Sequence, residues 1–357
     1  MHRREFIGAL AASALAMGLP GCTKPRSGEA ERGQVMTVAG PIESGTLGMT
    51  LAHEHLYADL RPYAEQVANP IPVDIDEVVR VVLPYLQDIR RLGCRTLVDC
   101  TATTVGRNPA LIKRLSQASG LQMLIATGAY VSAGGRFIPP HVLDETSDQL
   151  AARWTAEWRH GIGDTGIRPG LIKLGVEGDP LSATERKVLA AAARAHHESG
   201  LVIAVHTGPW SEVAPGRNAR CAFAQLELLE LAGVAPSAWI WVHAHNEVQA
   251  EHHVRVAERG GWVSFDGYRP GQEDDYVAMI GRLRDAGHLD RVLVSQDAGW
   301  YNAGQPQGGE FKPFSPLFSS LIPALRKGGF DEEQIQTLFV RNPAAAFVVR
   351  EQERMAG

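Results

Sequence analysis

Leu201-Val202-Ile203-Ala204-Val205-His206 is an apolar run that ends in a histidine. The chain contains eight apolar runs of similar length, of which this is the fifth. Apolar runs without polar alternation are typical of strands buried on both faces, as in parallel sheets covered by helices. We expect strands at Leu47–Leu51, Thr96–Cys100, Met123–Ala126, Leu171–Leu174, Val202–Val205, Trp239–Val242, Trp262–Phe265 and Val292–Val294.

Longer amphipathic stretches separate these runs. They predict helices at Ile75–Leu92, Gln149–Ile162, Thr184–Ser199, Phe223–Ala232, Gln249–Arg259 and Tyr276–Ala286. Eight strands alternating with helices favour a closed (β/α)₈ barrel, the TIM barrel, over a doubly wound sheet. We therefore predict an α/β fold of this type with a short N-terminal β extension.

Composition agrees with one globular enzyme-sized domain. The chain has 357 residues, of which 45% are hydrophobic and 21% charged, and such a chain can bury a large core. A formal net charge of -5 gives no broad attraction for phosphate backbones, so nucleic acid is excluded as a partner.

The N-terminus has the layout of an export signal. Arg3-Arg4 precede an uncharged apolar run from Ile7 to Leu19, which is too short to span a bilayer. The arginine pair resembles a twin-arginine signal, and Leu19-Pro20-Gly21-Cys22 resembles a lipoprotein processing box. We expect a signal peptide at 1–22, a linker at 23–33 and the barrel at 34–357. The mature protein would be periplasmic or anchored to a membrane by a lipid on Cys22, with plain cleavage of the signal as the alternative.

Polar side chains interrupt or end five of the apolar runs. His53 and His55, two residues apart, point to one side of an extended strand. Lys173 interrupts the fourth run, and the other three polar residues end the fifth, sixth and eighth runs: His206, His243 and Asp297. Active sites of these barrels lie at the carboxyl ends of the strands, so all six side chains are expected to meet there. Taken singly, a hydrogen-bonded core histidine or a lysine that reaches solvent is the competing interpretation.

The spacing and chemistry of the set point to a metal centre. Lys173 and His206 are 33 residues apart and His206 and His243 are 37 apart, each close to one βα unit. Imidazoles and a carboxylate suit zinc, which we favour, or manganese, cobalt and iron. Burial beside cations should keep the Lys173 amine neutral, and a neutral amine can take up carbon dioxide to form a carbamate that bridges two metals.

Several segments resemble the phosphotriesterase-like family of the amidohydrolase superfamily. They are Thr50-Leu51-Ala52-His53-Glu54-His55, Gly163 to Lys173, Val292 to Asp297 and Asn342-Pro343-Ala344, and the resemblance covers roughly Gln34 to Val349. It implies that His53, His55 and Asp297 hold the more buried of two divalent ions and that His206 and His243 hold the other. Carboxylated Lys173 and a hydroxide would bridge them, with Asp297 as the catalytic proton acceptor.

The remaining histidines are expected outside the ligand set. The segment from Pro236 to Gly260 aligns with the family without a gap only if His243 is the ligand, which leaves His245 beside the ligands or in the pocket. The pairs His196-His197 and His252-His253 fall in helical patterns and are expected on the outer surface.

The sequence favours a lactone or carboxylic ester as the substrate. The phosphotriesterases proper have an Asp-His pair after the seventh strand, where this chain has Asp266-Gly267, and it has Asn246 where they have a carboxylate. A lactone depends less on that proton relay, because the leaving alkoxide stays tethered to the product. We expect Tyr130, Tyr268, Arg269 and Trp300 to frame the substrate pocket, with Arg269 as a partner for an anionic group.

Other functions remain open at this level. The alternatives are a phosphotriesterase (organophosphate hydrolase), a deaminase or amide-bond hydrolase, and a non-catalytic metal-binding lipoprotein. Lys173 counts against the deaminases, and the complete ligand set counts against a non-catalytic protein. Many relatives in the family form homodimers, and no residue decides whether this chain does.

Overall fold

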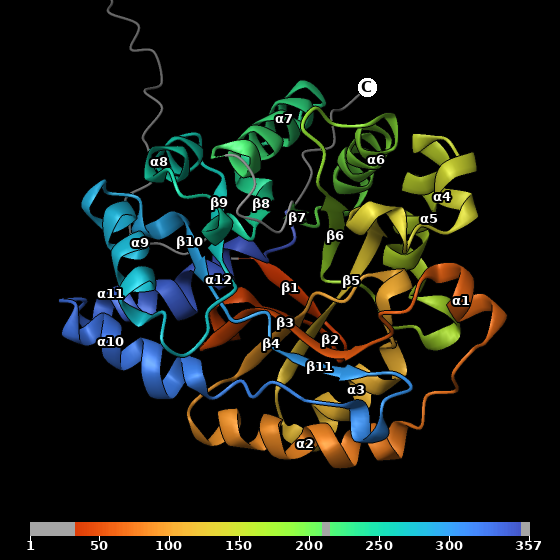
Figure 1. Cartoon of the computed structure of the whole chain (residues 1–357), viewed down its shortest axis with the longest axis horizontal. Helices are drawn as coiled ribbons and strands as arrows, with labels where there is room; N and C mark the ends of the chain where they lie inside the picture. The colour runs from red at the N-terminus through yellow and green to blue at the C-terminus, as the bar shows by residue number, and fades with distance from the viewer. Residues whose placement is uncertain (1–32, 209–214, 351–357) are drawn as a thin grey trace, which may run out of the picture.

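The computed structural model describes residues 33–208 and 215–350. Nine strands form one sheet in which every neighbouring pair is parallel, in the order β10-β9-β8-β7-β6-β5-β4-β3-β11 (Figure 1). Their bounds are β3 Thr50–Ala58, β4 Thr96–Asp99, β5 Gln122–Tyr130, β6 Leu171–Val176, β7 Ile203–Thr207, β8 Trp239–Val242, β9 Trp262–Phe265, β10 Val292–Val294 and β11 Gly299–Asn302.

The sheet curls into a barrel whose eighth strand is divided in two. β10 pairs with β9, and β11 pairs with β3 in the register Gly299 to His55. Between these halves the backbone N–H of Asp297 donates a hydrogen bond of 3.1 Å to the carbonyl of His53. The first and last strands of the barrel are thereby joined, and the prediction of an (β/α)₈ barrel is confirmed.

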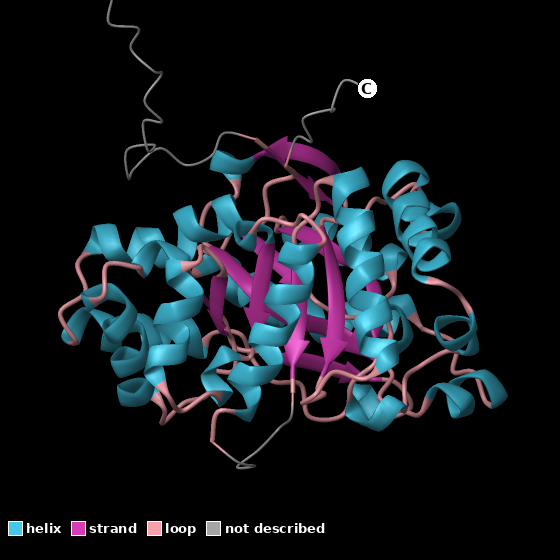
Figure 2. Ribbon diagram, turned by 90° about the horizontal axis from the view of Figure 1, so that it is seen from above, coloured by secondary structure: helices cyan, strands magenta, loops and turns pink. Residues whose placement is uncertain are grey.

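Helices surround the strands, as Figure 2 shows. They are α1 Tyr63–Ala68, α2 Ile75–Arg91, α3 Pro109–Ser119, α4 Pro140–Asp144, α5 Ser147–His160, α6 Ala183–Ser199, α7 Arg217–Leu231, α8 Ala250–Glu258, α9 Glu273–Asp285, α10 Ile322–Lys327, α11 Glu332–Gln336 and α12 Asn342–Ala346. Among the helices of the described ranges, none combines the length and apolar character that a membrane crossing needs.

Local sequence sets where the helices begin. α6 starts with a capping box in which the Ser182 side chain accepts from the backbone of Glu185 while the Glu185 side chain accepts from the backbone of Ser182. The Glu185 carboxylate also accepts from the backbone N–H groups of Glu177 and Gly178, at 2.7 and 2.8 Å. This one side chain therefore fixes the end of β6 against the start of α6.

Alternation along the strands divides the core into an inner and an outer layer. Ile203 and Val205 of β7 pack in the outer layer between strands and helices, whereas Ala204 belongs to the cluster inside the barrel. Strand geometry then places His206 on the inner side, two residues beyond Ala204. Lys173 follows Leu171 on the inner side of β6 in the same way.

The first barrel strand begins later than predicted. We expected Leu47–Leu51, but β3 runs from Thr50 to Ala58 and is buried throughout. Gly48 with a φ of 64° marks a turn before it. The apolar pattern missed the second half of the strand because His53, Glu54 and His55 are polar residues whose burial depends on partners rather than on hydrophobicity.

The segment before the barrel forms a hairpin. β1 (Gln34–Thr37) and β2 (Gly40–Glu43) pair antiparallel, and Val35 joins the cluster inside the barrel. The backbone N–H of Val38 donates to the carbonyl of Met123 on β5, at 2.9 Å. The expected signal peptide at 1–22 and nearly all of the linker at 23–33 lie outside the described residues, so this division stays a prediction.

Candidate metal centre

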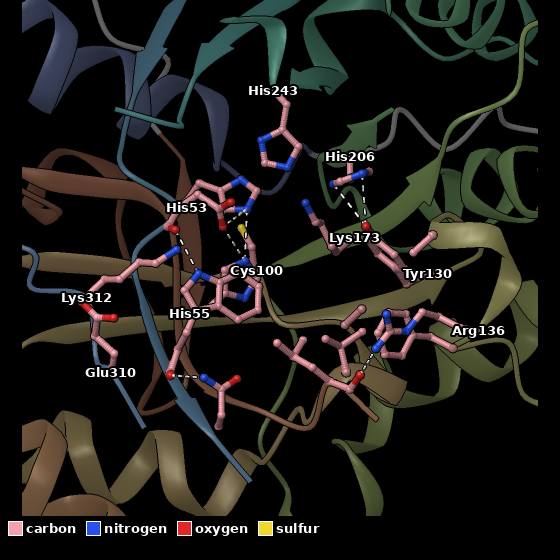
Figure 3. Close-up of a pocket in the computed structure, with 18 of the residues that line it drawn as sticks. His53, His55, Cys100, Tyr130, Arg136, Lys173, His206, His243, Glu310 and Lys312 are labelled. Atoms are coloured by element: carbon pink, nitrogen blue, oxygen red, sulfur yellow. Dashed lines mark hydrogen bonds and ion pairs between the residues drawn. The ribbon is translucent and has the colours of Figure 1, made fainter. Parts of the chain in front are cut away.

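The six expected ligands line one cavity at the carboxyl ends of the strands. Its volume is about 380 Å³, and its floor is formed by His53, His55, Lys173, His206, His243 and Asp297. Figure 3 shows the labelled histidines and Lys173 pointing toward one another, with His53 and His55 on β3 and the others on or directly after β6, β7 and β8. All six side chains are buried, none with more than 6% of its surface exposed. The structure thus brings together every residue of the predicted set.

Three of these side chains converge tightly. Nε2 of His53 lies 3.3 Å from Nε2 of His55, and Asp297 Oδ1 lies 3.1 Å from His55 Nε2. Within the described residues Asp297 Oδ1 is a buried oxygen without an aligned hydrogen bond. A set of imidazole nitrogens and a carboxylate oxygen within 4.8 Å of one another is suited to a divalent cation.

Neighbouring groups orient the ligand nitrogens. Nδ1 of His55 is hydrogen-bonded to the Thr101 hydroxyl at 2.8 Å, and Nδ1 of His243 lies 2.7 Å from Asp266 Oδ1. Nδ1 of His53 lies 3.4 Å from the other oxygen of Asp266. With a proton on each Nδ1, the Nε2 atoms carry free lone pairs, as metal ligation requires.

The electrostatics of the cavity keep these ligands in their metal-binding forms. Burial, with the charge of Lys173 adding to it, lowers the pKa of His53 to about 3, and burial beside His243 holds the pKa of His206 well below its ordinary value. Burial opposes ionisation of Asp297, but the imidazole of His55, whose Nε2 lies 3.1 Å from Oδ1, keeps the pKa of Asp297 below its usual range. The neutral imidazole is therefore favoured for His53 and His206, and the ionised carboxylate for Asp297.

Lys173 has the environment expected for a neutral amine. Its side chain is buried, and burial lowers its pKa below that of an exposed lysine. None of the carboxylates that the structure describes lies within ion-pair distance, 4.0 Å, of its ammonium position. The residue thus fits the carbamate that the family resemblance implies.

Glu54 supports the centre and was not singled out in the sequence. It is fully buried and points away from His53 and His55, as alternation along β3 requires. Its Oε1 accepts from Ser295 Oγ at 2.7 Å and from the backbone N–H of Gln296 at 3.1 Å. A charged residue between two strand histidines was the available signal, since a buried carboxylate needs such partners.

The expected substrate residues separate into two groups. Tyr130, Arg269 and Trp300 line the cavity, where Tyr130 Oη lies 3.1 Å from His206 Nε2 and the Trp300 ring stacks on His55 at 3.8 Å. Tyr268 does not line it. That side chain is buried and donates from its hydroxyl to Glu273 Oε1 at 2.6 Å, so the structure gives it no route to substrate.

His245 lies beside the centre, in the space next to Gly267. Its Nδ1 is 3.5 Å from Asp266 Oδ1, the carboxylate that also contacts His243. A Cβ atom placed on Gly267 would come within 2.2 Å of His245 Nε2. The space left by the absent side chain at 267 is therefore occupied by the imidazole of His245, which lies in the short 3₁₀ turn after β8.

The prediction for the helical histidines is wrong for two of four. His196 and His253 are buried, with 4% and 3% exposed. The His196 Nδ1 bonds to the Leu201 carbonyl at 2.7 Å, and the His253 Nε2 bonds to the Ala244 carbonyl at 2.8 Å. These carbonyls satisfy the imidazoles inside the molecule, and neither histidine lines the metal cavity.

Comparisons with known proteins agree with this geometry. The family model described as Phosphotriesterase family matches residues 33–347. A relative named phosphotriesterase homology protein from Escherichia coli (strain K12) is 28% identical, covering 84% of this chain and 98% of its own. A relative named aryldialkylphosphatase from Saccharolobus solfataricus is 26% identical, covering 86% of this chain and 96% of its own.

A solved structure gives the same result in three dimensions. It is described as organophosphate hydrolysis activity engineered from a weak promiscuous lactonase template, and it superposes with a TM-score of 0.76 at 29% identity over 88% of this chain and 99% of its own. The match of the family model along most of the chain, together with the barrel and the cluster at its strand ends, shows that this protein belongs to the phosphotriesterase family.

Proposed function

We propose that the protein is a binuclear metal-dependent hydrolase that acts on a lactone or carboxylic ester. The observation that carries the proposal is the convergence of four histidines, Asp297 and a buried lysine on the floor of one cavity. Burying an ammonium group is unfavourable, so a purely structural role at this position would favour an apolar side chain such as leucine. A carbamate on Lys173 would instead give the residue a function as a ligand to both metals.

Each residue has a defined task in this proposal. His53, His55 and Asp297 would hold the more buried ion, His206 and His243 the more exposed one, and Lys173 both. When bound, the two metals would acidify a water and polarise the substrate carbonyl oxygen. Asp297, whose carboxylate lines the cavity, would take the released proton.

The surroundings of Asp266 support a lactone or ester over a phosphotriester. Gly267 carries no side chain for a relay. The His245 imidazole lies beside Asp266 instead, but Asn246 cannot accept a proton as a carboxylate would. Opening a lactone ring leaves the alkoxide tethered in the site, where Asp297 could return its proton directly. A phosphotriesterase is the second candidate, favoured by the relative named aryldialkylphosphatase.

A substrate panel tests the proposal. We would measure kcat/KM for lactones, aryl carboxylic esters, an amide and paraoxon-type triesters, on protein of measured metal content. A clear preference for lactones or esters is expected. Preference for the triesters would establish the second candidate, preference for the amide would establish an amidohydrolase, and no turnover by fully metal-loaded protein would favour a non-catalytic metal-binding lipoprotein.

We also propose that the protein is exported and tethered through a lipid on Cys22. The basis is the sequence of residues 1–22, which precede the described structure. Replacing Arg3 and Arg4 by lysine should retain the precursor in the cytoplasm, and Cys22→Ala should release the mature protein from the membrane fraction. Undiminished export or unchanged membrane association would remove the respective claim.

Sedimentation of the purified barrel would decide between monomer and homodimer.

A further inference from the structure

Arg136 holds a fixed position on the rim of the metal cavity. It follows β5 and lines the cavity together with its neighbour Phe137, above whose ring its guanidinium carbon lies at 4.8 Å from the centroid. Its Nη2 donates to the carbonyl of Leu60, which belongs to the segment after β3 (Figure 3). The side chain therefore bridges two loops at the mouth while most of its guanidinium stays accessible to solvent and to a ligand.

Glu177 at the end of β6 fixes the loop that carries Arg136. Its carboxylate accepts from the Ser132 hydroxyl at 2.9 Å and from the backbone N–H groups of Ala133 and Gly134 at 3.0 and 2.9 Å. Ala133 and Gly134 both have a positive φ, of 57° and 63°. Consecutive N–H groups in such a turn form a concavity for an anion, which Glu177 fills from within the protein.

Arg136 differs from Arg269 in the donors that it leaves free. The guanidinium of Arg269 is hydrogen-bonded to backbone carbonyls. Its Nη1 donates to the carbonyls of Tyr268 and Gln296, and its Nη2 donates to the carbonyl of Asp297. Arg136 makes one such bond, and its other donors have no hydrogen-bond partner among the described residues. No described carboxylate lies within 4.0 Å of either guanidinium. The guanidinium available to a ligand is thus that of Arg136.

The rim as a whole carries surplus positive charge. Beyond the floor residues, the lining includes three cationic side chains, Arg136, Arg269 and Lys312, and one acidic side chain, Glu310. The wall between the rim and the floor is apolar and aromatic. From the floor, His206 contacts the Tyr130 hydroxyl, and the Tyr130 ring packs edge-on against Phe137 with centroids 5.9 Å apart.

We infer that the substrate carries a carboxylate, which Arg136 binds at the rim while the reacting carbonyl lies on the floor. The inference rests on the proposed function and deepens it. A planar guanidinium binds a carboxylate with two parallel hydrogen bonds. Glu310 limits the surplus charge and disfavours a doubly charged phosphate. Tyr130 and Phe137 would contact the apolar part of the substrate between its two polar ends.

A matched pair of substrates tests the inference. One is a γ-lactone with an ω-carboxyalkyl chain and the other is its primary amide, which has the same shape without the charge. Wild type should prefer the acid in kcat/KM. Arg136→Gln should lose about 10- to 100-fold on the acid, mainly through KM, and change less than about twofold on the amide. Arg136→Lys should keep an intermediate preference, because it keeps the charge without the planar fork.

Controls separate this role from a structural one. Arg114→Gln, an exposed residue of α3 outside the cavity, should leave both substrates unaffected. Non-hydrolysable cyclopentanones with the same two side chains give the binding preference by calorimetry even if catalysis is slow. The inference would be overturned if Arg136→Gln lost equal kcat/KM on the acid and the amide, or if wild type bound both analogues with equal affinity. Tighter binding of a phosphorylated analogue would overturn the choice of carboxylate. Turnover of the amide alone would leave the proposed hydrolase function intact, whereas turnover of neither lactone would count against that function.

Discussion

Glu54 Oε2 accepts a hydrogen bond of 2.7 Å from the backbone N–H of Ala298. The two residues belong to opposite ends of the chain, on the first barrel strand and in the break of the eighth. Ala298 directly follows Asp297, whose φ of 49° is uncommon for a residue with a side chain. The carboxylate therefore holds the strained segment that aims Asp297 at the cavity.

Replacing Glu54 by glutamine should weaken both the fold and the metal site. One of the oxygens becomes an NH₂ group that faces a donor, so at least one buried hydrogen bond is lost, at a cost of about 2–3 kcal/mol in the free energy of unfolding. Urea unfolding and metal retention against a chelator would measure the two effects. Glu43→Gln, at an exposed residue of β2, is the matched control. Unchanged metal retention in Glu54→Gln would show that Asp297 is held by other contacts.

Removing Lys173 should lower the metal content and the activity. Wild type is expected to hold close to two divalent ions per chain when purified with metal and bicarbonate. Lys173→Ala should hold fewer and lose about a hundredfold or more in activity, because the bridging ligand is gone. Elemental analysis measures the first effect, with Lys113→Ala on the exposed face of α3 as control. A Lys173→Ala protein with full metal and full activity would contradict the carbamate.

The parts of the site that follow strand periodicity could be predicted from the sequence. Lys173 interrupts an apolar run at the carboxyl end of a predicted barrel strand, so its burial and its place in the site could be inferred from the run and the fold. Arg136 and Glu177 could not be found in this way, because they lie beyond strand ends, where hydrogen bonds to particular backbone groups decide their positions. Tyr268 was assigned to the pocket for its place after β9, yet nothing in the sequence showed that its hydroxyl would bond to Glu273.

The buried helical histidines predict a loss of stability in mild acid. Burial lowers the pKa of both His196 and His253 to about 4, below the 6.5 of an exposed histidine. As pH falls below 6.5 the unfolded chain takes up protons first, so the stability that is present above pH 6.5 is lost between about 6.5 and 4. At pH 5 the loss should be roughly 2 kcal/mol for each histidine.

Unfolding at several pH values, with equal metal content, would measure this dependence. His196→Gln keeps a side-chain N–H for the Leu201 carbonyl but does not titrate, so its stability should fall less between pH 7 and pH 5 than that of wild type. His160→Gln, at the exposed end of α5, should follow wild type. If the free energy of unfolding fell equally with pH in wild type and in His196→Gln, His196 would not contribute to the loss of stability in acid.

Glu177→Gln should loosen the Ser132–Gly134 turn without touching the metal ligands. The amide keeps one acceptor oxygen in place of two, so about one hydrogen bond is lost, worth roughly 1 kcal/mol. We expect KM to rise by roughly three- to tenfold while kcat stays within about twofold, because the turn positions substrate rather than the reacting atoms. Glu251→Gln, at an exposed residue of α8, is the control. A fall in kcat with constant KM would show that Glu177 acts on the chemistry instead.

Gly267 and His245 are sterically coupled. Any side chain at 267 must displace the imidazole, and any residue smaller than histidine at 245 leaves a hole beside Asp266. The two positions therefore form one steric unit shared by neighbouring strands, and their substitutions should be strongly non-additive. A histidine placed at position 267 would therefore require the His245 ring to turn away or to be replaced by a smaller side chain.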